Sequence, residues 1–160
     1  MSDLEIHAAA PEDIPAIVAM LADDALGARR ESPDDLTPYT AAFERLAADP
    51  NQHVVVAVRV GTAGKGTTGT EKVVGTLQLT IVPGLSRRGS TRSIIEGVRI
   101  HADERGSGLG TRLIEWAIDE SRRQNCQLVQ LTTDATRTDA HRFYERLGFE
   151  PSHIGFKMSI

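Results

Sequence analysis

A pair of β-branched, apolar runs in the first half of the chain predicts a long β-hairpin. The runs cover residues 54–58 and 73–81. A glycine- and threonine-rich stretch, residues 61–72, lies between them and predicts the hairpin loop. Because consecutive strands without an intervening helix break the alternation of strand and helix, the chain does not fit a purely parallel, doubly wound sheet.

The other apolar patterns predict a mixed sheet with helices around it. Further strands are expected at residues 4–8, 94–100, 127–133 and 152–160. Helices are expected at residues 11–27, 36–48, 108–125 and about 140–147, with Gly148 ending the last in a left-handed conformation. These elements predict one domain, residues 1–160, of the α+β class. We expect a three-layer arrangement in which helices flank a mixed, mostly antiparallel sheet of six or seven strands.

Composition and the start of the chain narrow the class of protein. One hundred and sixty residues with 40% hydrophobic side chains can bury a core that needs no cross-link. Cys126 is the single cysteine, so the chain has neither an internal disulfide nor a thiolate pair for zinc. The first residues lack the pattern of a signal peptide, and no apolar stretch approaches the roughly 18 residues of a membrane span. We therefore expect a cytoplasmic protein with no metal and no membrane partner.

The charge balance disfavours nucleic acid as a partner. Eighteen basic and 22 acidic residues give a formal net charge of −4, and aromatic residues make up 4% of the chain. An acidic protein repels phosphate backbones, and few rings are available to stack on bases. The same balance favours a small cationic partner.

Residues 98–113 join a strand, a glycine-rich turn and an amphipathic helix. Gly106, Gly108 and Gly110 permit positive φ angles and a close approach to a ligand, at which the free N–H groups of the helix start would point. This arrangement suits a phosphate. A Walker A loop has Gly-Lys-Ser/Thr where this chain has Gly110, Thr111 and Arg112. The dinucleotide fingerprint has a glycine where Thr111 stands, so neither motif fits. Glycines that only allow tight packing of strand and helix are the alternative.

Two motifs in the second half of the chain resemble the GNAT superfamily of N-acetyltransferases. Arg105, Gly108 and Gly110 fit the acetyl-CoA loop of that family, Arg/Gln-x-x-Gly-x-Gly/Ala. Residues 140–149 are similar to its Ala-x-x-Phe-Tyr-x-x-x-Gly-Phe ending. The resemblance covers residues 73–160, and the first half of the chain matches only in its order of strand and helices.

The resemblance implies an acyl-CoA N-acyltransferase fold with a splayed sheet, with acetyl-CoA as the donor and no metal. Pantetheine is expected to enter the gap between strands 94–100 and 127–133 like an added strand, where the Val98 N–H would bind the oxyanion. The residues that the resemblance assigns to the coenzyme are Val98, Arg99, Ile100, Arg105, Gly106, Ser107, Gly108, Leu109, Gly110, Thr111, Arg137 and Tyr144.

Arg137 departs from the family pattern, which often has asparagine seven positions before the tyrosine. A charge-assisted contact with a phosphate is the expected replacement. Arg112 and Arg142 are further candidate partners of the coenzyme phosphates. A solvated charge on a helix or loop is the alternative for each of these three arginines.

Tyr144 is the candidate general acid. The resemblance implies that its hydroxyl protonates the coenzyme A thiolate after the amide has formed. An amphipathic core tyrosine packed beside Phe143 is the alternative.

Glu96 is the candidate general base, acting directly or through a water molecule. Apolar neighbours would raise the pKa of this carboxyl towards the working pH. Strand alternation predicts Glu96 on the face of Val98 and Ile100, unless Gly97 forms a bulge that changes its facing. A structural role is the alternative.

The acceptor is less constrained than the donor. The leading interpretation is an enzyme that moves the acetyl group to a primary amine of a small molecule or peptide by direct transfer in a ternary complex. The alternatives are a protein lysine or N-terminal acetyltransferase and a non-catalytic acyl-CoA-binding sensor module. By the resemblance, residues 20–45 and 83–92 select the acceptor, and the sequence leaves its identity and the acyl chain open.

The last nine residues predict an edge strand. Ile154, Phe156, Met158 and Ile160 alternate with polar residues and would share one face. Such an edge can pair with the same edge of another chain, so a homodimer is expected.

Overall fold

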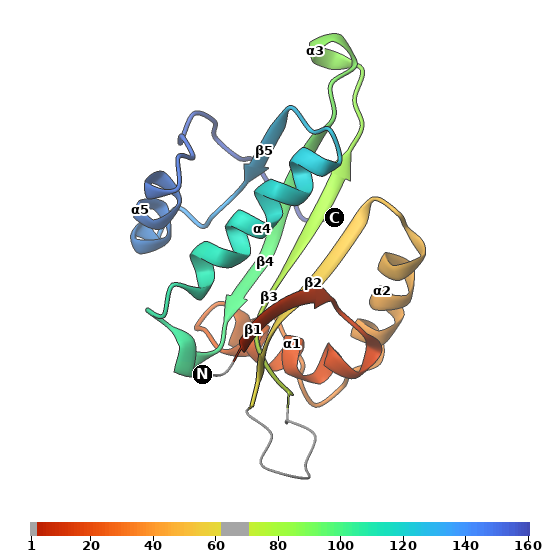
Figure 1. Cartoon of the computed structure of the whole chain (residues 1–160), viewed down its shortest axis with the longest axis vertical. Coiled ribbons are helices and arrows are strands. Elements are labelled where there is room, and N and C mark those ends of the chain that lie inside the picture. The colour runs from red at the N-terminus through yellow and green to blue at the C-terminus, as the bar shows by residue number, and fades with distance from the viewer. Residues whose placement is uncertain (1–2, 62–70) are drawn as a thin grey trace.

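Five strands form one mixed sheet in the order β1-β2-β3-β4-β5 (Figure 1). The structure, a computed structural model, describes residues 3–61 and 71–160. Strands β1 to β4 pair antiparallel with one another, and β5 is parallel to β4. The strands are β1 Asp3–Ala8, β2 Gln52–Val60, β3 Glu71–Val82, β4 Arg92–Ile100 and β5 Leu128–Leu131. The predicted fold class is confirmed, with five strands among the described residues instead of six or seven.

Strands β2 and β3 are the predicted hairpin. They pair from Gln52 with Thr80 to Val60 with Glu71. Most of the loop expected at residues 61–72 lies outside the described residues, and its last two positions already belong to β3.

Five α-helices and three 3-10 turns accompany the sheet in the described residues. They are the 3-10 turn η1 Pro11–Asp13, α1 Ile14–Ala22, the 3-10 turn η2 Gly27–Arg29, α2 Thr37–Ala48, α3 Ser86–Gly89, the 3-10 turn η3 Ala102–Glu104, α4 Leu109–Arg123 and α5 Thr138–Arg146. Gly148 has the left-handed conformation predicted after the last helix, with φ of 92°.

The first predicted helix, residues 11–27, is shorter than expected. Helix α1 ends at Ala22, and Gly27 begins a separate 3-10 turn. A β-carbon at Gly27 would lie 1.9 Å from the carbonyl oxygen of Leu21, so the chain folds back closely against the end of α1. The glycine therefore allows a close approach of two backbone segments and does not mark the end of the helix.

Helix α4 packs along β4 and β3 and fills the larger core (Figure 1). Its buried side chains lie between 0 and 2% exposed and meet the apolar face of the central strands. The residues of this core are Val55, Ala57, Val74, Leu77, Leu79, Ile81, Ile95, Leu109, Leu113, Ile114 and Ala117. Burial of each large side chain contributes roughly 1.5–3 kcal/mol to stability, so this contact fixes α4 on the sheet.

Strands β4 and β5 separate partway along their length. They pair from Arg92 with Leu128 to Ile95 with Leu131, and no pair follows. The edge of β4 from Glu96 to Ile100 therefore faces the gap without a strand partner among the described residues. This is the splay that the family resemblance implied.

A bulge lies at the point where the two strands part. Gln78 pairs with Glu96 and Thr76 with Arg99, so one residue of β3 opposes two of β4. Gly97, one of these two, has φ of 61°, which glycine adopts without strain.

The strand predicted at residues 152–160 is absent from the structure. This segment has no regular secondary structure and all of its residues are exposed. Its alternating pattern favours a strand, but a strand forms only where an edge satisfies its backbone N–H and C=O groups. In this single chain, no edge lies alongside it.

The substitution Leu113→Ala should destabilise the protein by about 2–5 kcal/mol, because it leaves a cavity between α4 and the sheet. Leu113 is 0% exposed. Leu85, which is 97% exposed, provides the matched control, and Leu85→Ala should change the free energy of unfolding by less than about 0.5 kcal/mol. Urea unfolding measures both. Equal effects would contradict the core described above.

Candidate active site

The glycine-rich turn leads from β4 into α4 and has the backbone conformation expected for an anion site. Gly106 and Gly108 have φ of 80° and 85°, and Gly108 is the N-cap of α4. The Leu109 N–H donates to Ser107 Oγ at 3.3 Å. The N–H groups of Gly110 and Thr111 precede the first intrahelical bond and have no partner among the described residues. Their free donors and the positive end of the helix dipole suit an anion.

Gly110 differs from the sequence-based expectation. It does not have a positive φ. A β-carbon at this position would lie 3.3 Å from Cζ of Phe143, tighter than an ordinary contact. The third glycine therefore permits close packing of α5 against the start of α4, instead of a close approach to a ligand.

Ion pairs hold the turn against distant parts of the chain. Glu104 accepts two hydrogen bonds from Arg59 of β2, at 3.0 Å to Nε and 2.9 Å to Nη2. Arg105 Nη2 lies 2.6 Å from Oδ2 of Asp23, beyond the end of α1. The side chain of Arg105, predicted to contact the coenzyme, thus joins the turn to the segment after α1.

Tyr144 lies on α5 among aromatic side chains that pack against the α4 core. Its ring makes edge contacts with Phe143, 5.1 Å between ring centroids, and with Phe149, 5.9 Å. Burial raises the pKa of the Tyr144 hydroxyl, and the charges of Arg137 and Arg99 oppose this shift in part. The hydroxyl stays protonated at neutral pH and makes no hydrogen bond to the described residues, so it can donate its proton to a ligand.

Arg99 connects β4 with the segment after α1. Its Nη2 lies 3.6 Å from Oδ2 of Asp24, and its Nη1 donates to the Val98 carbonyl at 2.9 Å. The Nε of Arg99 is buried and has no partner among the described residues. The pKa of Asp24 is lowered, chiefly by the Gly27 N–H and also by the charges of Arg99 and Arg137. The side chains of Asp24, Arg99 and Arg137 therefore share one electrostatic environment with Tyr144.

Glu96 does not lie on the face of Val98 and Ile100, so the prediction from strand alternation is wrong. Glu96 pairs with Gln78 and Arg99 with Thr76. Because Gln78 and Thr76 are two residues apart in β3, they share a face of the sheet, and the bulge at Gly97 therefore puts Glu96 on the same face as Arg99. Glu96 is exposed. The bulge was the alternative that the sequence left open, and it turns this carboxyl towards the side on which Asp24 meets Arg99.

The remaining predicted phosphate partners are exposed. Arg112 is exposed near the start of α4, and Arg137 forms the N-cap of α5. Arg142 pairs with Asp139 one turn earlier on α5. The structure thus leaves Arg112 and Arg137 without an ion-pair partner among the described residues.

The loop at residues 83–91 lies at the other end of β4 from the glycine-rich turn (Figure 1). It contains the short left-handed turn α3, in which Arg87 and Arg88 have φ of 52° and 61°. Because β4 separates this loop from residues 106–111 by its full length, the structure does not bring residues 83–91 to the site. The other predicted acceptor region, residues 20–45, does reach it through Asp24.

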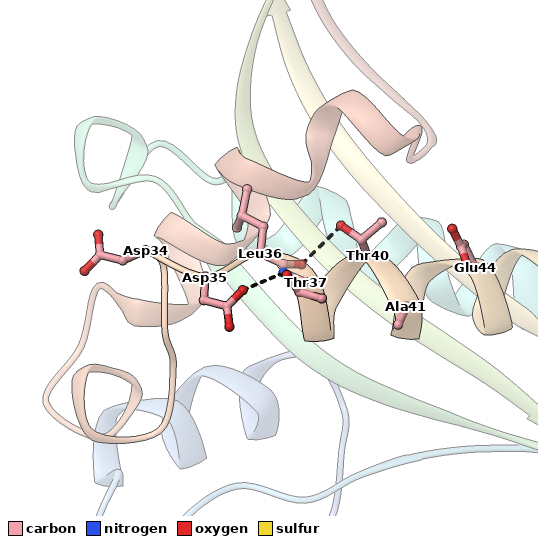
Figure 2. A pocket seen from close by; sticks show the side chains of 7 residues that line it. All are labelled: Asp34, Asp35, Leu36, Thr37, Thr40, Ala41 and Glu44. Carbon is pink, nitrogen blue, oxygen red and sulfur yellow. Dashed lines mark hydrogen bonds between the residues drawn. The ribbon is translucent and has the colours of Figure 1, made fainter.

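A pocket at the start of α2 carries three carboxylates (Figure 2). It shares no lining residue with the cluster of Asp24, Arg99, Arg137 and Tyr144. Asp35 accepts a hydrogen bond from the Thr37 N–H at 3.0 Å, and Thr40 Oγ1 donates to the Leu36 carbonyl at 3.1 Å. These bonds serve the first turn of the helix. The pocket therefore has a local structural explanation.

Sequence patterns did not reveal the Arg59–Glu104 pair or the contact of Asp24 with Arg99. The partners in each pair are far apart in the sequence, so no local motif indicates them. Within residues 3–61 and 71–160, no three His, Cys, Asp or Glu side chains gather as they would around a metal ion. No helix in these ranges is long and apolar enough to cross a membrane.

Residues 15–149 match the acetyltransferase (GNAT) family, which the splayed sheet and the turn before α4 already indicate. The chain belongs to this family. It is an N-acetyltransferase of the acyltransferase class, as the family resemblance of the sequence implied.

Several relatives of this GNAT chain match it over almost their whole length. It is 29% identical over 156 residues to the aminoalkylphosphonate N-acetyltransferase of Salmonella typhimurium, covering 98% of this chain and 91% of the relative. A solved transcriptional regulator from Bacillus halodurans C-125 is 42% identical with a TM-score of 0.86, over 99% of this chain and 100% of that one. A Trypanosoma brucei acetyltransferase is 25% identical with a TM-score of 0.71, over 99% and 100%.

The substitution Glu104→Gln should lower the free energy of unfolding at pH 7 more than at pH 3. The hydrogen bond from Arg59 lowers the pKa of Glu104 in the folded protein. Its stabilisation is therefore complete above the unfolded pKa, about 4.3, and is lost as the pH falls through the lower folded value. Urea unfolding at the two pH values measures this difference, with the exposed Glu115→Gln as the control. An effect of equal size at both pH values would contradict the ion pair.

Proposed function

We propose that this enzyme transfers the acetyl group of acetyl-CoA to a primary amine of a small molecule or peptide by direct transfer in a ternary complex. One observation carries the proposal. The unpaired edge of β4 runs from Glu96 to Ile100 and leads into the turn before α4, while Tyr144 on α5 packs against the same core as Val98 and Ile100. This arrangement would offer an open strand edge to the thioester arm, free N–H donors to phosphate and a proton source.

The coenzyme would bind along these features in order. Pantetheine pairs with the β4 edge at Val98 and Ile100 as an added strand would. The pyrophosphate lies on the backbone donors of residues 106–111, including the free N–H groups of Gly110 and Thr111. In this proposal Arg112 and Arg137 contact the remaining phosphate oxygens, and Arg137 supplies a charge in place of the amide that the family often has.

The reaction needs no covalent enzyme intermediate. The neutral amine attacks the thioester carbonyl carbon, and the Val98 N–H stabilises the oxyanion that forms. The carbon–sulfur bond then breaks, and Tyr144 donates its proton to the departing thiolate. The attack leaves the amine nitrogen positively charged, and Glu96 accepts the proton that this nitrogen loses, directly or through a water molecule.

The acceptor that suits this site carries an amine and an acidic group. The Salmonella relative is named for an aminoalkylphosphonate, which has both. In this chain, Asp24 would offer its carboxylate to the amine, and Arg99, whose Nη2 lies 3.6 Å from Oδ2 of Asp24, would offer its guanidinium to the acidic group. Free thiol release tests this choice when it is measured with aminoalkylphosphonates, with alkylamines of equal length that lack the phosphonate, with polyamines and with a lysine peptide. A preference for the alkylamines without the phosphonate would contradict it.

A second candidate function is a non-catalytic acyl-CoA-binding module. The Bacillus relative, at 42% identity, is described as a transcriptional regulator. Thermal shift with acetyl-CoA, coenzyme A, NADH and ATP separates the outcomes when combined with thiol release. A ligand at about 100 times its Kd stabilises the fold by roughly 2.7 kcal/mol, which is several degrees for this chain length. A shift with both coenzyme A species but no thiol release with any amine would favour the binding module.

The substitution Tyr144→Phe should lower kcat by at least about tenfold, because general acid catalysis contributes roughly 10²–10⁴-fold and the thiolate is a fairly good leaving group. The ring contacts with Phe143 and Phe149 remain, so the acetyl-CoA thermal shift should be unchanged. Steady-state rates with a saturating amine measure the effect. A kcat within twofold of the wild type would contradict the role of Tyr144.

The substitution Glu96→Gln should remove the acidic limb of the pH–rate profile of kcat/KM, because the amide cannot accept a proton. The matched control is Glu115→Gln, which removes an equal charge from an exposed position on α4. Its profile should follow that of the wild type. An unchanged profile for Glu96→Gln would remove this residue as the base.

A further inference from the structure

A cavity of about 340 Å³ lies between α2, the first residues of β2 and the C-terminal half of α4. A volume of this size is enough for a small organic molecule. In Figure 1, α2 lies on the opposite side of the molecule from α5, the helix that carries Tyr144. None of the residues that we assign to the coenzyme or to catalysis lines the cavity. It is therefore separate from the site of the proposed reaction.

Apolar side chains form much of the cavity wall. Phe43 and Leu46 line it from α2, and Trp116 lines it from α4. Each of these three side chains is only partly buried, and α2 has no fully buried residue. Protein interiors are close-packed, so the apolar side chains of α2 lack the contacts that a core helix makes. An apolar ligand in the cavity would supply them.

A ring nitrogen of His53 in the same wall has no partner. Its Nε2 is buried and makes no hydrogen bond to the described residues. An unsatisfied buried polar atom costs free energy, so such atoms are usually paired in native proteins. With its proton on Nδ1, a neutral imidazole accepts a hydrogen bond at Nε2. This atom therefore suits an N–H donor on a ligand.

Glu120 adds a carboxylate to the wall. Its side chain is 15% exposed, and its oxygens accept hydrogen bonds from Gln124 and Arg123, each at 2.8 Å. The hydrogen bond from Gln124 lowers the pKa of this carboxyl, burial opposes the shift, and Arg123 and His53 add to it. The group is ionised at neutral pH and can accept a further hydrogen bond. No Lys or Arg is among the described residues that line the cavity, so its charge favours a cation.

We propose that this cavity binds a small aromatic amine. The ring of the ligand packs between Phe43, Leu46 and Trp116. Its ammonium group donates hydrogen bonds to Nε2 of His53 and to a carboxylate oxygen of Glu120. An indole ring also attracts a nearby cation, which adds to this preference. The proposal concerns a second site, so it goes beyond the proposed reaction and does not depend on it.

Fluorescence provides the test, because Trp116 is the single tryptophan of the chain. In the absence of acetyl-CoA, 2-phenylethylamine should change the emission of the full chain saturably, with a Kd below about 1 mM. Phenylacetate has a similar size and the opposite charge. It should bind at least about tenfold more weakly, because the Glu120 carboxylate repels it.

Three variants assign the signal to the cavity. Glu120→Gln should weaken the binding of 2-phenylethylamine at least about fivefold, because the amide has no charge to pair with the ammonium group. Glu115→Gln removes an equal charge from an exposed position on the same helix and should leave the Kd within about twofold. Asp24→Asn changes the proposed acceptor site and should also leave the Kd unchanged. Unchanged melting temperatures show that the three variants fold.

Three results would overturn the proposal. Emission without a saturable change up to about 10 mM amine would show that the cavity does not bind the probe. Equal affinities for the amine and for phenylacetate, or equal affinities of the wild type and Glu120→Gln, would remove the carboxylate as the group that selects a cation. Loss of binding in Asp24→Asn would place the amine in the acceptor site instead, a result that leaves the proposed function intact.

Discussion

The separation of β4 from β5 after Ile95 is the constraint on which the site depends. Backbone N–H and C=O groups seek hydrogen-bond partners, so a strand edge that is left open inside a sheet is costly unless something occupies it. The bulge at Gly97 and the packing of α4 hold β4 in place while its edge stays open. In the proposed function, a thioester arm that pairs as a strand would meet this requirement, and the fold keeps its core while one strand edge stays open.

The sequence predicted well those features that depend on neighbouring residues. The positive φ angles of Gly108 and Gly148, the face of α4 that carries Leu113 and the strands of the central hairpin all follow from local patterns. The glycine-rich turn before α4 also has a local signature, and the family match supports the resemblance that it indicated.

The sequence predicted poorly those features that depend on distant partners. The side of the sheet on which Glu96 lies is set by the bulge, where one residue of β3 pairs opposite two of β4. The alternation of residues within β4 alone could not show this. The length of α1 depends on how Gly27 packs against Leu21. The pair of Arg59 and Glu104 joins residues 45 positions apart, so no short motif contains both. The tail has the pattern of a strand, but the pattern does not say where its partner edge lies.

The contact between Gly110 and Phe143 joins the turn before α4 to helix α5, which carries the proposed proton source. The hydrogen of Gly110 is all that separates the first turn of α4 from the ring of Phe143, and Tyr144 is the next residue on α5. A β-carbon at position 110 would press on this ring, so the ring or the helix that carries it would have to shift by a few tenths of an ångström. The backbone of the turn before α4 and the placement of Tyr144 are therefore not independent in this protein, and a substitution at Gly110 would reach the proposed proton source through Phe143 without touching it.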